Sequence, residues 1–341
     1  MKRLLFRKKN LLEWEEIPEP KLTSPNEAII RPIAVSRCDL DLAIIRGSTL
    51  FRPPFPIGHE FIGEIDHVSE DLSDQFPKGT RVILPFQISC GQCQPCKFND
   101  SKNCDQMNRH PSDFGMGHTA KEFGGALSEK IKIPFASHML FPIEKDLNPI
   151  AIASISDNIA EAWKMVGMHL EDSSEKKVLV LGGKASSIGL YSALLGVAMG
   201  AEVYYSDSDS QRLKIAEECG AKIIEAITLP KSFGKFDIVA DAYGTEDGFY
   251  CAMRSVAPFG TMSTASVFWT NSFSIPFLEI YNYGIKIVIG RVNSHEWIPK
   301  VLSIIRSGKF PIEKVVTRIA NWKDAKEAMM EETTKLVITH D

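Results

Sequence analysis

Hydrophobic and polar positions follow two different patterns along the chain. Up to about residue 148, short apolar alternations are bounded by Pro, Gly, Asn or Asp, as in Ala28–Val35, Phe61–Ile65 and Thr80–Leu84. Runs of this length between turn-forming residues are typical of short β-strands. The first part of the chain is therefore predicted to be rich in strands.

From about residue 175, apolar runs of strand length alternate with segments of helical spacing, such as Ile188–Met199 and Gln211–Cys219. The strand-like runs are Val178–Leu181, Glu202–Tyr205, Ala221–Ile224, Asp237–Ala240, Gly260–Ser263 and Ile285–Ile289. Such alternation predicts an α/β fold with a parallel sheet that is covered by helices on both faces. The tail adds an amphipathic helix from Ile298 and a last apolar run at Leu336–Ile338.

Composition adds limits to this picture. The 341 residues are enough for about two domains, and 44% hydrophobic with 24% charged residues is typical of a globular chain. A net charge of -4 gives no overall attraction to nucleic acid or to anionic membranes. The start, Met1–Lys9, has too short an apolar stretch for a secretory signal, and no run reaches the ~18 apolar residues of a membrane span. We expect a soluble, cytoplasmic protein with reduced thiols.

The segment after Val178–Leu181 has the pattern of a nucleotide site. Small residues form a turn, a helix follows, and a second strand ends at Asp207, a carboxylate suited to the ribose hydroxyls of NAD. The predicted cofactor-binding residues are Gly182, Gly183, Ser187, Ile188, Gly189, Asp207 and Arg212. The turn is longer than in G-x-G-x-x-G, so an ordinary tight turn with Asp207 as a helix cap is the alternative. Asp207 favours NAD over NADP, although Arg212 is close enough to reach the adenine side.

Four cysteines follow the spacing C-x2-C-x2-C-x7-C: Cys90, Cys93, Cys96 and Cys104. Four thiolates in one loop predict a closed, structural zinc site. The ferredoxin pattern has a last interval of three residues followed by proline, which this sequence lacks, and redox thiols are the remaining alternative. A nucleic-acid-binding zinc module is disfavoured, because Lys97 is the only basic residue among those between Cys90 and Asp100. Cys219 and Cys251 are assigned to helix packing.

Three further residues have the chemistry of metal ligands: Cys38, His59 and Asp157. Taken singly, each has an ordinary explanation, since a lone cysteine is usually buried, a lone histidine satisfies a local hydrogen bond, and Asp157 precedes a helical segment that it could cap. Their spacing in the sequence does not indicate that the three residues form one site.

With these motifs in their order, the chain resembles the zinc-dependent alcohol dehydrogenases of the medium-chain dehydrogenase/reductase superfamily over essentially its whole length. The resemblance implies a GroES-like catalytic domain at 1–148 and 291–341, and a Rossmann domain at 149–290. It implies two zinc ions per chain, the structural one and a catalytic one held by Cys38, His59 and Asp157. Glu60 would orient His59 or act as an alternate ligand, and Asp41 would lie behind the ligands. Relatives are dimers or tetramers.

The implied reaction is hydride transfer between an alcohol or polyol, or its carbonyl product, and NAD(H), with zinc stabilising the alkoxide. Two positions depart from the family pattern, because Leu40 and Ala43 stand where relatives carry groups that relay the alcohol proton. We therefore assign proton transfer to Glu60 as a hypothesis. The alternative is a nucleotide- and zinc-binding protein of the same fold with weak or lost dehydrogenase activity.

Overall fold

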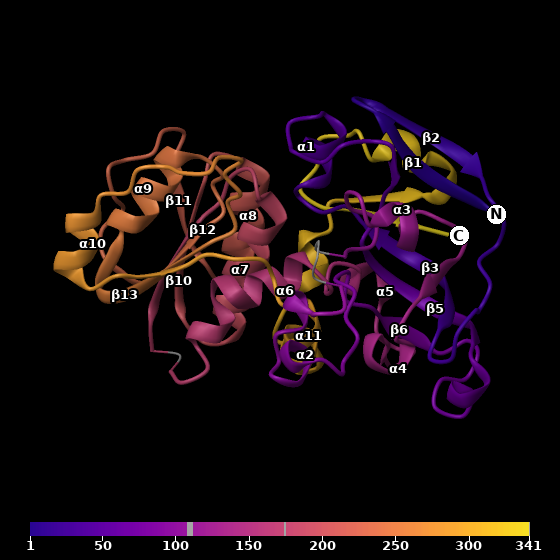
Figure 1. The fold of residues 1–341 in the computed structure, drawn as a ribbon. Helices are drawn as coiled ribbons and strands as arrows, with labels where there is room; N and C mark the ends of the chain where they lie inside the picture. Colours follow the sequence, from indigo (N-terminus) through magenta and orange to yellow (C-terminus); the bar gives the residue numbers. More distant parts are fainter. Residues whose placement is uncertain (108–111, 174, 341) are drawn as a thin grey trace. The chain divides into compact units, whose positions relative to one another are not determined.

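The computed structural model describes residues 1–107, 112–173 and 175–340. The chain forms two compact units (Figure 1). Unit 1 comprises Met1–Asp157, Asn293–Pro299 and Val316–Asp341, and unit 2 comprises Asn158–Val292 and Lys300–Val315. The division is discontinuous, but Lys300–Val315 belongs to unit 2, whereas the expected boundary assigned all of 291–341 to the first domain.

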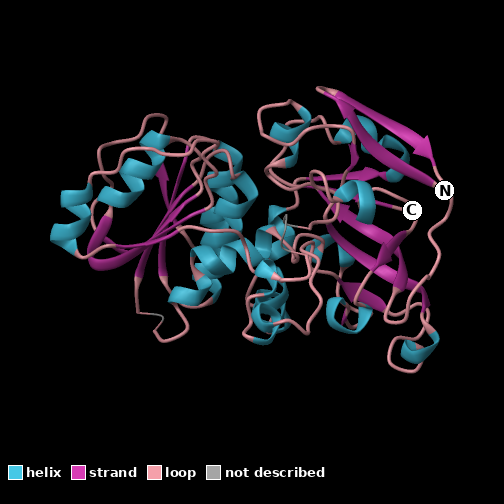
Figure 2. Cartoon of the chain, viewed as in Figure 1, coloured by secondary structure: helices cyan, strands magenta, loops and turns pink. Residues whose placement is uncertain are grey.

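Unit 1 is built from strands with short helices between them (Figure 2). Its strands are β1 (Lys2–Lys8), β2 (Leu11–Glu16), β3 (Ala28–Ser36), β4 (Phe55–Pro56), β5 (Glu60–Val68), β6 (Arg81–Ile83), β7 (Ile131–Ile133), β8 (Phe141–Pro142), β15 (Arg318–Asn321) and β16 (Leu336–Thr339). Its α-helices are α1 (Asp41–Ile45), α2 (Gln94–Lys97), α3 (Ala120–Phe123), α4 (Ala136–Met139), α5 (Pro149–Ile152) and α12 (Ala325–Ala328). Short 3-10 turns lie at Glu70–Leu72, Ser101–Asn103 and Trp322–Asp324.

Two sheets enclose the core of unit 1. The larger has the order β15-β16-β3-β5-β6-β8, with β7 paired to β3, and the smaller has the order β2-β1-β4. Phe6, Phe55, Phe61 and Phe114 are buried in this core. The central strand β3 lies between β16 and β5, so a strand from the end of the chain pairs with a strand from its first forty residues.

Unit 2 is a parallel sheet with helices on both faces. Its strands are β9 (Lys177–Leu181), β10 (Glu202–Asp207), β11 (Lys222–Glu225), β12 (Phe236–Asp241), β13 (Val256–Thr264) and β14 (Lys286–Val288). Its helices are α6 (Asn158–Met165), α7 (Ser186–Ala198), α8 (Ser210–Glu218), α9 (Glu246–Arg254) and α10 (Phe277–Tyr283), with 3-10 turns at Gly167–His169 and Ile312–Val315. Helix α11 (Ser294–Arg306) contributes to both units. Figure 1 shows α7 and α8 on one side of the strands and α9 on the other.

The strand order in unit 2 is β11-β10-β9-β12-β13-β14, and every pairing is parallel. Strands β9 and β12 are buried along almost their whole length, which explains their nearly continuous apolar sequences. The order reverses between β9 and β12, and ligands of such sheets bind outside the carboxyl ends of the strands at that point. This architecture confirms the predicted α/β class with a doubly wound parallel sheet and a separate β-rich unit.

Candidate metal centres and cofactor site

Sheet pairing in unit 1 brings several candidate ligands to one place. Cys38 follows the end of β3, while His59 directly precedes β5. The two strands are antiparallel, with Ser36 opposite Glu60, so the end of β3 lies beside the start of β5. The sequence intervals alone give no sign of this, because the register between the strands sets the contact.

Ligand atoms of Cys38, His59, Glu60 and Asp157 all lie within 4.8 Å of one another, and the four residues are buried. His59 Nε2 is 3.2 Å from Asp157 Oδ2. Tetrahedral zinc bonds of about 2.0–2.1 Å to nitrogen and oxygen place two such ligand atoms about 3.3 Å apart. The spacing and the mixture of thiol, imidazole and carboxylate therefore fit a zinc ion, with Cys38, His59 and Asp157 as its protein ligands.

Asp41 supports this cluster from the first turn of α1. Its Oδ2 accepts a hydrogen bond from the Cys38 backbone N–H at 2.9 Å, which fixes the loop that carries the thiol. Its Oδ1 lies 3.6 Å from His59 Nδ1, on the side of the ring away from Asp157. A carboxylate behind a ligating imidazole orients the ring and raises its basicity. The position fits the role that the resemblance implies for Asp41.

The electrostatics of the cluster favour a bound cation. Burial, together with the carboxylates of Asp157 and Glu60, raises the pKa of the Cys38 thiol well above its ordinary value. Burial alone would favour neutral His59, but Asp41 and Asp157 outweigh it and raise the pKa of the imidazole to about 9. A positive ion among these groups would stabilise the thiolate and the carboxylates together.

Glu60 is completely buried and sits in a polar arrangement of its own. Its Oε2 accepts a hydrogen bond from Ser154 Oγ at 2.6 Å and pairs with Lys335 Nζ at 2.9 Å. Burial raises the pKa of Glu60 to about 7, against the opposing attraction of the Lys335 ammonium. Ser154 Oγ in turn lies 2.8 Å from Ser36 Oγ.

Lys335 and Ser154 are site residues that the sequence did not reveal. Lys335 is fully buried just before β16, and its Nζ also donates to the Arg37 carbonyl at 2.9 Å. The one available signal was a lysine directly before the apolar run Leu336–Ile338. Leu40 and Ala43 offer no hydroxyl or imidazole, as expected, and Leu40 contributes a backbone N–H to Cys38 Sγ at 3.4 Å.

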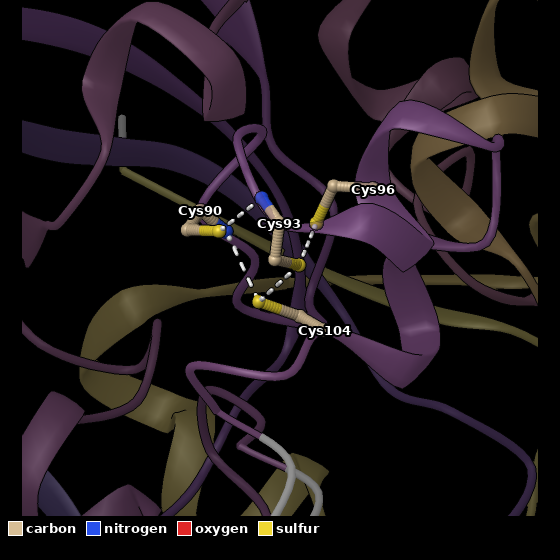
Figure 3. Close-up of side chains that lie close together, drawn as sticks. All are labelled: Cys90, Cys93, Cys96 and Cys104. Carbon is tan, nitrogen blue, oxygen red and sulfur yellow. Dashed lines mark hydrogen bonds between the residues drawn. The ribbon is translucent and has the colours of Figure 1, made fainter.

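The four-cysteine lobe converges as its spacing predicts (Figure 3). Cys93 Sγ lies 3.4 Å from Cys96 Sγ and 3.8 Å from Cys104 Sγ. Zn–S bonds of about 2.3 Å in a tetrahedron place sulfurs about 3.8 Å apart. Backbone N–H groups of Gln92 and Cys93 point to Cys90 Sγ at 3.4 Å, an arrangement that stabilises thiolates. The lobe fits a second, closed zinc site.

The predicted cofactor residues gather at the carboxyl ends of β9 and β10. Gly182 and Gly183 form the turn after β9, and Ser187, Ile188 and Gly189 lie buried in the first turns of α7. A Cβ on Gly183 would come within 2.7 Å of backbone atoms of Tyr243. The close backbone approach and the N-terminus of α7 fit a pyrophosphate.

Asp207 ends β10, as expected, but its carboxylate is already engaged. Arg212 binds it through Nε and Nη2, both at 2.7 Å, and the Tyr205 hydroxyl donates to Oδ2 at 2.6 Å. Arg212 therefore faces Asp207, a pairing that the sequence did not indicate. The cap of α8 is Asp209, which accepts from the Arg212 backbone N–H at 2.9 Å, so Asp207 is not that cap.

Comparisons with known proteins agree with this geometry. The model of the alcohol dehydrogenase GroES-like domain matches residues 24–145. An uncharacterised zinc-type alcohol dehydrogenase-like protein of Bacillus subtilis is 24% identical over 368 residues, covering 95% of this chain and 96% of that protein. The (R,R)-butanediol dehydrogenase of Saccharomyces cerevisiae is 25% identical over 300 residues, covering 77% and 75%.

Among solved structures, the alcohol dehydrogenase TADH from Thermus sp. ATN1 superimposes with a TM-score of 0.88 and 25% identity, over 100% of both chains. Within the described residues, no helix has the length and apolar character needed to cross a membrane. The GroES-like match lies within unit 1, and the shared fold extends over the whole chain. The chain therefore contains an alcohol dehydrogenase GroES-like domain and is similar over its length to zinc-type alcohol dehydrogenases.

Proposed function

We propose that the protein is an oxidoreductase that transfers a hydride between an alcohol or polyol and NAD at a zinc ion held by Cys38, His59 and Asp157. The observation that carries the proposal is the convergence of these three side chains, from distant parts of the sequence, in a buried cluster of suitable spacing. Bound zinc would supply Lewis-acid polarisation of the substrate oxygen, and bound NAD would supply the hydride acceptor.

The protein's own part in the reaction is to position ligands and to handle the proton. Asp41 lies behind the His59 ring, and it also accepts a hydrogen bond from the Cys38 N–H in the loop between β3 and α1. Glu60 is the proposed proton acceptor, since Leu40 and Ala43 have no titratable group. Its raised pKa, about 7, is favourable for proton exchange near neutral pH. Ser154 and Lys335 fix the carboxylate in place.

The preferred cofactor is proposed to be NAD. Asp207 presents a carboxylate at the end of β10, where it disfavours the 2'-phosphate of NADP. Arg212 neutralises that carboxylate in this structure, so the preference depends on whether the pair opens when the ribose binds. Titration of the purified protein with NADH and NADPH tests this, and tighter NADPH binding would refute the assignment.

Two zinc ions per chain are proposed, one in each cluster. Metal analysis of the purified protein should find two zinc ions per chain, and Cys38→Ala should reduce this to one. The Cys38→Ala protein should also lose cofactor reduction with every member of a panel of alcohols and polyols. Cys219→Ala is the matched control, because Cys219 lies at the end of α8 and in neither cluster. Full activity of Cys38→Ala would overturn the proposal.

The role of Glu60 needs a separate test. Glu60→Gln keeps the size of the side chain and removes its proton exchange, so turnover should fall about 10–100-fold with a changed pH profile. Unchanged turnover and an unchanged profile would exclude Glu60 as the proton acceptor. If the zinc-loaded wild type reduced no cofactor with any substrate, the alternative of a binding protein without catalysis would be favoured instead. The complete set of metal ligands speaks against that alternative.

The protein is further proposed to be cytoplasmic and to form a homodimer or homotetramer. All seven cysteines are free thiols, and the five that belong to the two clusters must be reduced to bind metal. No nucleic-acid or membrane partner is proposed. Exposed apolar side chains of α10, on unit 2, support the oligomer.

A further inference from the structure

A buried ion pair lies in α6, outside both metal clusters. Lys164 Nζ is 2.5 Å from Glu161 Oε1, and the two side chains are only 4% and 9% exposed. Burying two opposite charges gains little stability over an apolar pair of the same size, because both lose their hydration. The contribution of such a pair therefore lies in the groups that it positions more than in stability.

Lys164 connects the ends of two neighbouring strands. Its ammonium donates to the Thr264 carbonyl at 3.2 Å and to the Gly290 carbonyl at 2.7 Å. Thr264 is the last residue of β13, and Gly290 lies two residues after β14. The side chain thus fixes both strand exits, while Glu161 balances its charge.

The strand exits lie on the half of the sheet that the nicotinamide would occupy. A dinucleotide spans the point at which the strand order reverses, with one mononucleotide on each side. The glycine turn and Asp207 mark the adenosine half, over β9 and β10, which leaves β12, β13 and β14 for the nicotinamide half. At the start of α6, Asn158 Nδ2 donates to Ser187 Oγ in α7 at 2.7 Å. Helix α6 is therefore tied to both halves.

We propose that Lys164, held by Glu161, is a positioning residue for the nicotinamide end of the cofactor site. The inference rests on the proposed function in that it takes a nicotinamide dinucleotide as the ligand. Lys164 fixes the backbone after β13 and β14, at the edge of the site that would hold the nicotinamide end. Without the ammonium, two carbonyls lose their donor and the strand exits become free to move, while the glycine turn at β9 is unaffected.

The test compares two ligands that differ in the nicotinamide. In the double variant Glu161→Gln/Lys164→Met, both charges are removed together, so no buried charge is left without its partner. Isothermal titration should show that NADH binds about tenfold more weakly than to the wild type, the loss expected for one or two hydrogen bonds. ADP-ribose, which lacks the nicotinamide, should bind within about twofold of its wild-type affinity, since its contacts are unchanged.

Lys176→Met is the matched control. Lys176 also donates to a backbone carbonyl in unit 2, that of His169 at 2.6 Å, but it directly precedes β9, at the amino end of that strand. This variant should bind both ligands as the wild type does. The double variant Glu161→Gln/Lys164→Gln, whose amide groups keep N–H donors and leave no buried charge unpaired, provides a milder change if the first double variant is poorly folded, and it should lower NADH affinity selectively.

Equal weakening of NADH and ADP-ribose, or no weakening of either, would overturn the role of Lys164, because a merely structural lysine would not separate the two ligands. Failure of the proposed function has a different result. Binding of NADH without any cofactor reduction would contradict the proposed catalysis alone, whereas a wild-type protein that bound neither NADH nor ADP-ribose would overturn the dinucleotide site and the role of Lys164 with it.

Discussion

Glu60 shows how much a single buried residue depends on its partners. Lys335→Met would leave the carboxylate buried without its ammonium, and we expect the free energy of unfolding to fall by about 3–5 kcal/mol. Urea denaturation of the zinc-loaded protein measures this. Lys335→Arg keeps a cation and should lose much less. Equal stability of the Met variant and the wild type would mean that Glu60 is protonated or paired elsewhere.

His169 makes a pH-dependent contribution to the free energy of unfolding of unit 2. Burial, aided by the charge of Lys176, lowers the pKa of His169 to about 4 from an ordinary value of 6.5. The unfolded chain therefore binds the proton more tightly, so the stabilisation is complete above pH 6.5 and is lost as the pH falls toward 4.

His169→Gln should remove about 1–3 kcal/mol of this pH dependence, an amount reduced from the full shift because the side chain is partly exposed. Unfolding free energies at a series of pH values between the two pKa values provide the measurement. His118→Gln is the control, since His118 is exposed. An identical pH dependence in the His169 variant and the wild type would contradict the assignment.

At the level of individual residues, the sequence was informative only where the ligand chemistry was clustered. The four cysteines lie within one loop, so their spacing indicates a site directly. Cys38, His59 and Asp157 could be grouped only through resemblance to a family. Lys335 and Ser154 stayed hidden, because a lysine or serine has no distinctive pattern and its partner is chosen by strand pairing far along the chain.

The turn between β9 and α7 is the element on which the cofactor site depends. Gly183→Ala would place a methyl group 2.7 Å from backbone atoms of Tyr243, which cannot move aside as a side-chain tip can. We expect a loss of about 1–3 kcal/mol in unfolding free energy together with weaker ADP-ribose binding. Thermal unfolding and titration check the two effects. A variant with wild-type stability and affinity would show that the turn has more room than the structure indicates.

Elements with strong periodicity were predicted well. The six strands of unit 2 and helices α7 and α8 lie within a few residues of their predicted bounds, and the signal is strongest in β9 and β12, which are buried along almost their whole length. Strands β1 and β2 were missed, since their alternation is masked by charged residues on the exposed face. Helix α11 begins at Ser294, before the predicted Ile298, and contains Pro299 without ending there.

The proposed oligomer is supported by an exposed apolar surface on unit 2. Phe277, Leu278 and Tyr281 of α10 are 67%, 68% and 73% exposed. Strand β14 is the edge of the six-stranded sheet and pairs only with β13 among the described strands. An unpaired edge beside apolar side chains is suited to pairing with a second copy about a two-fold axis.

Leu278→Glu should therefore convert the oligomer to smaller species. Light scattering after size-exclusion chromatography should give a wild-type mass that is a multiple of 38.0 kDa and a lower mass for the variant. Ile227→Glu is the control, because Ile227 is 79% exposed but follows β11 at the opposite edge of the sheet. A monomeric wild type, or an unchanged mass for Leu278→Glu, would contradict this surface.

The position of β16 also determines which of the two units can fold first during synthesis. Ser36 in β3 bonds to Leu336 in β16 across 300 residues, and Lys335 reaches Glu60 across 275. Unit 2 lies almost entirely between these partners, so a ribosome completes it before it supplies the strand that unit 1 lacks. We expect the cofactor unit to fold during synthesis, while the catalytic unit waits for the end of translation. The metal ligands would thus remain open to water until the last strand docks.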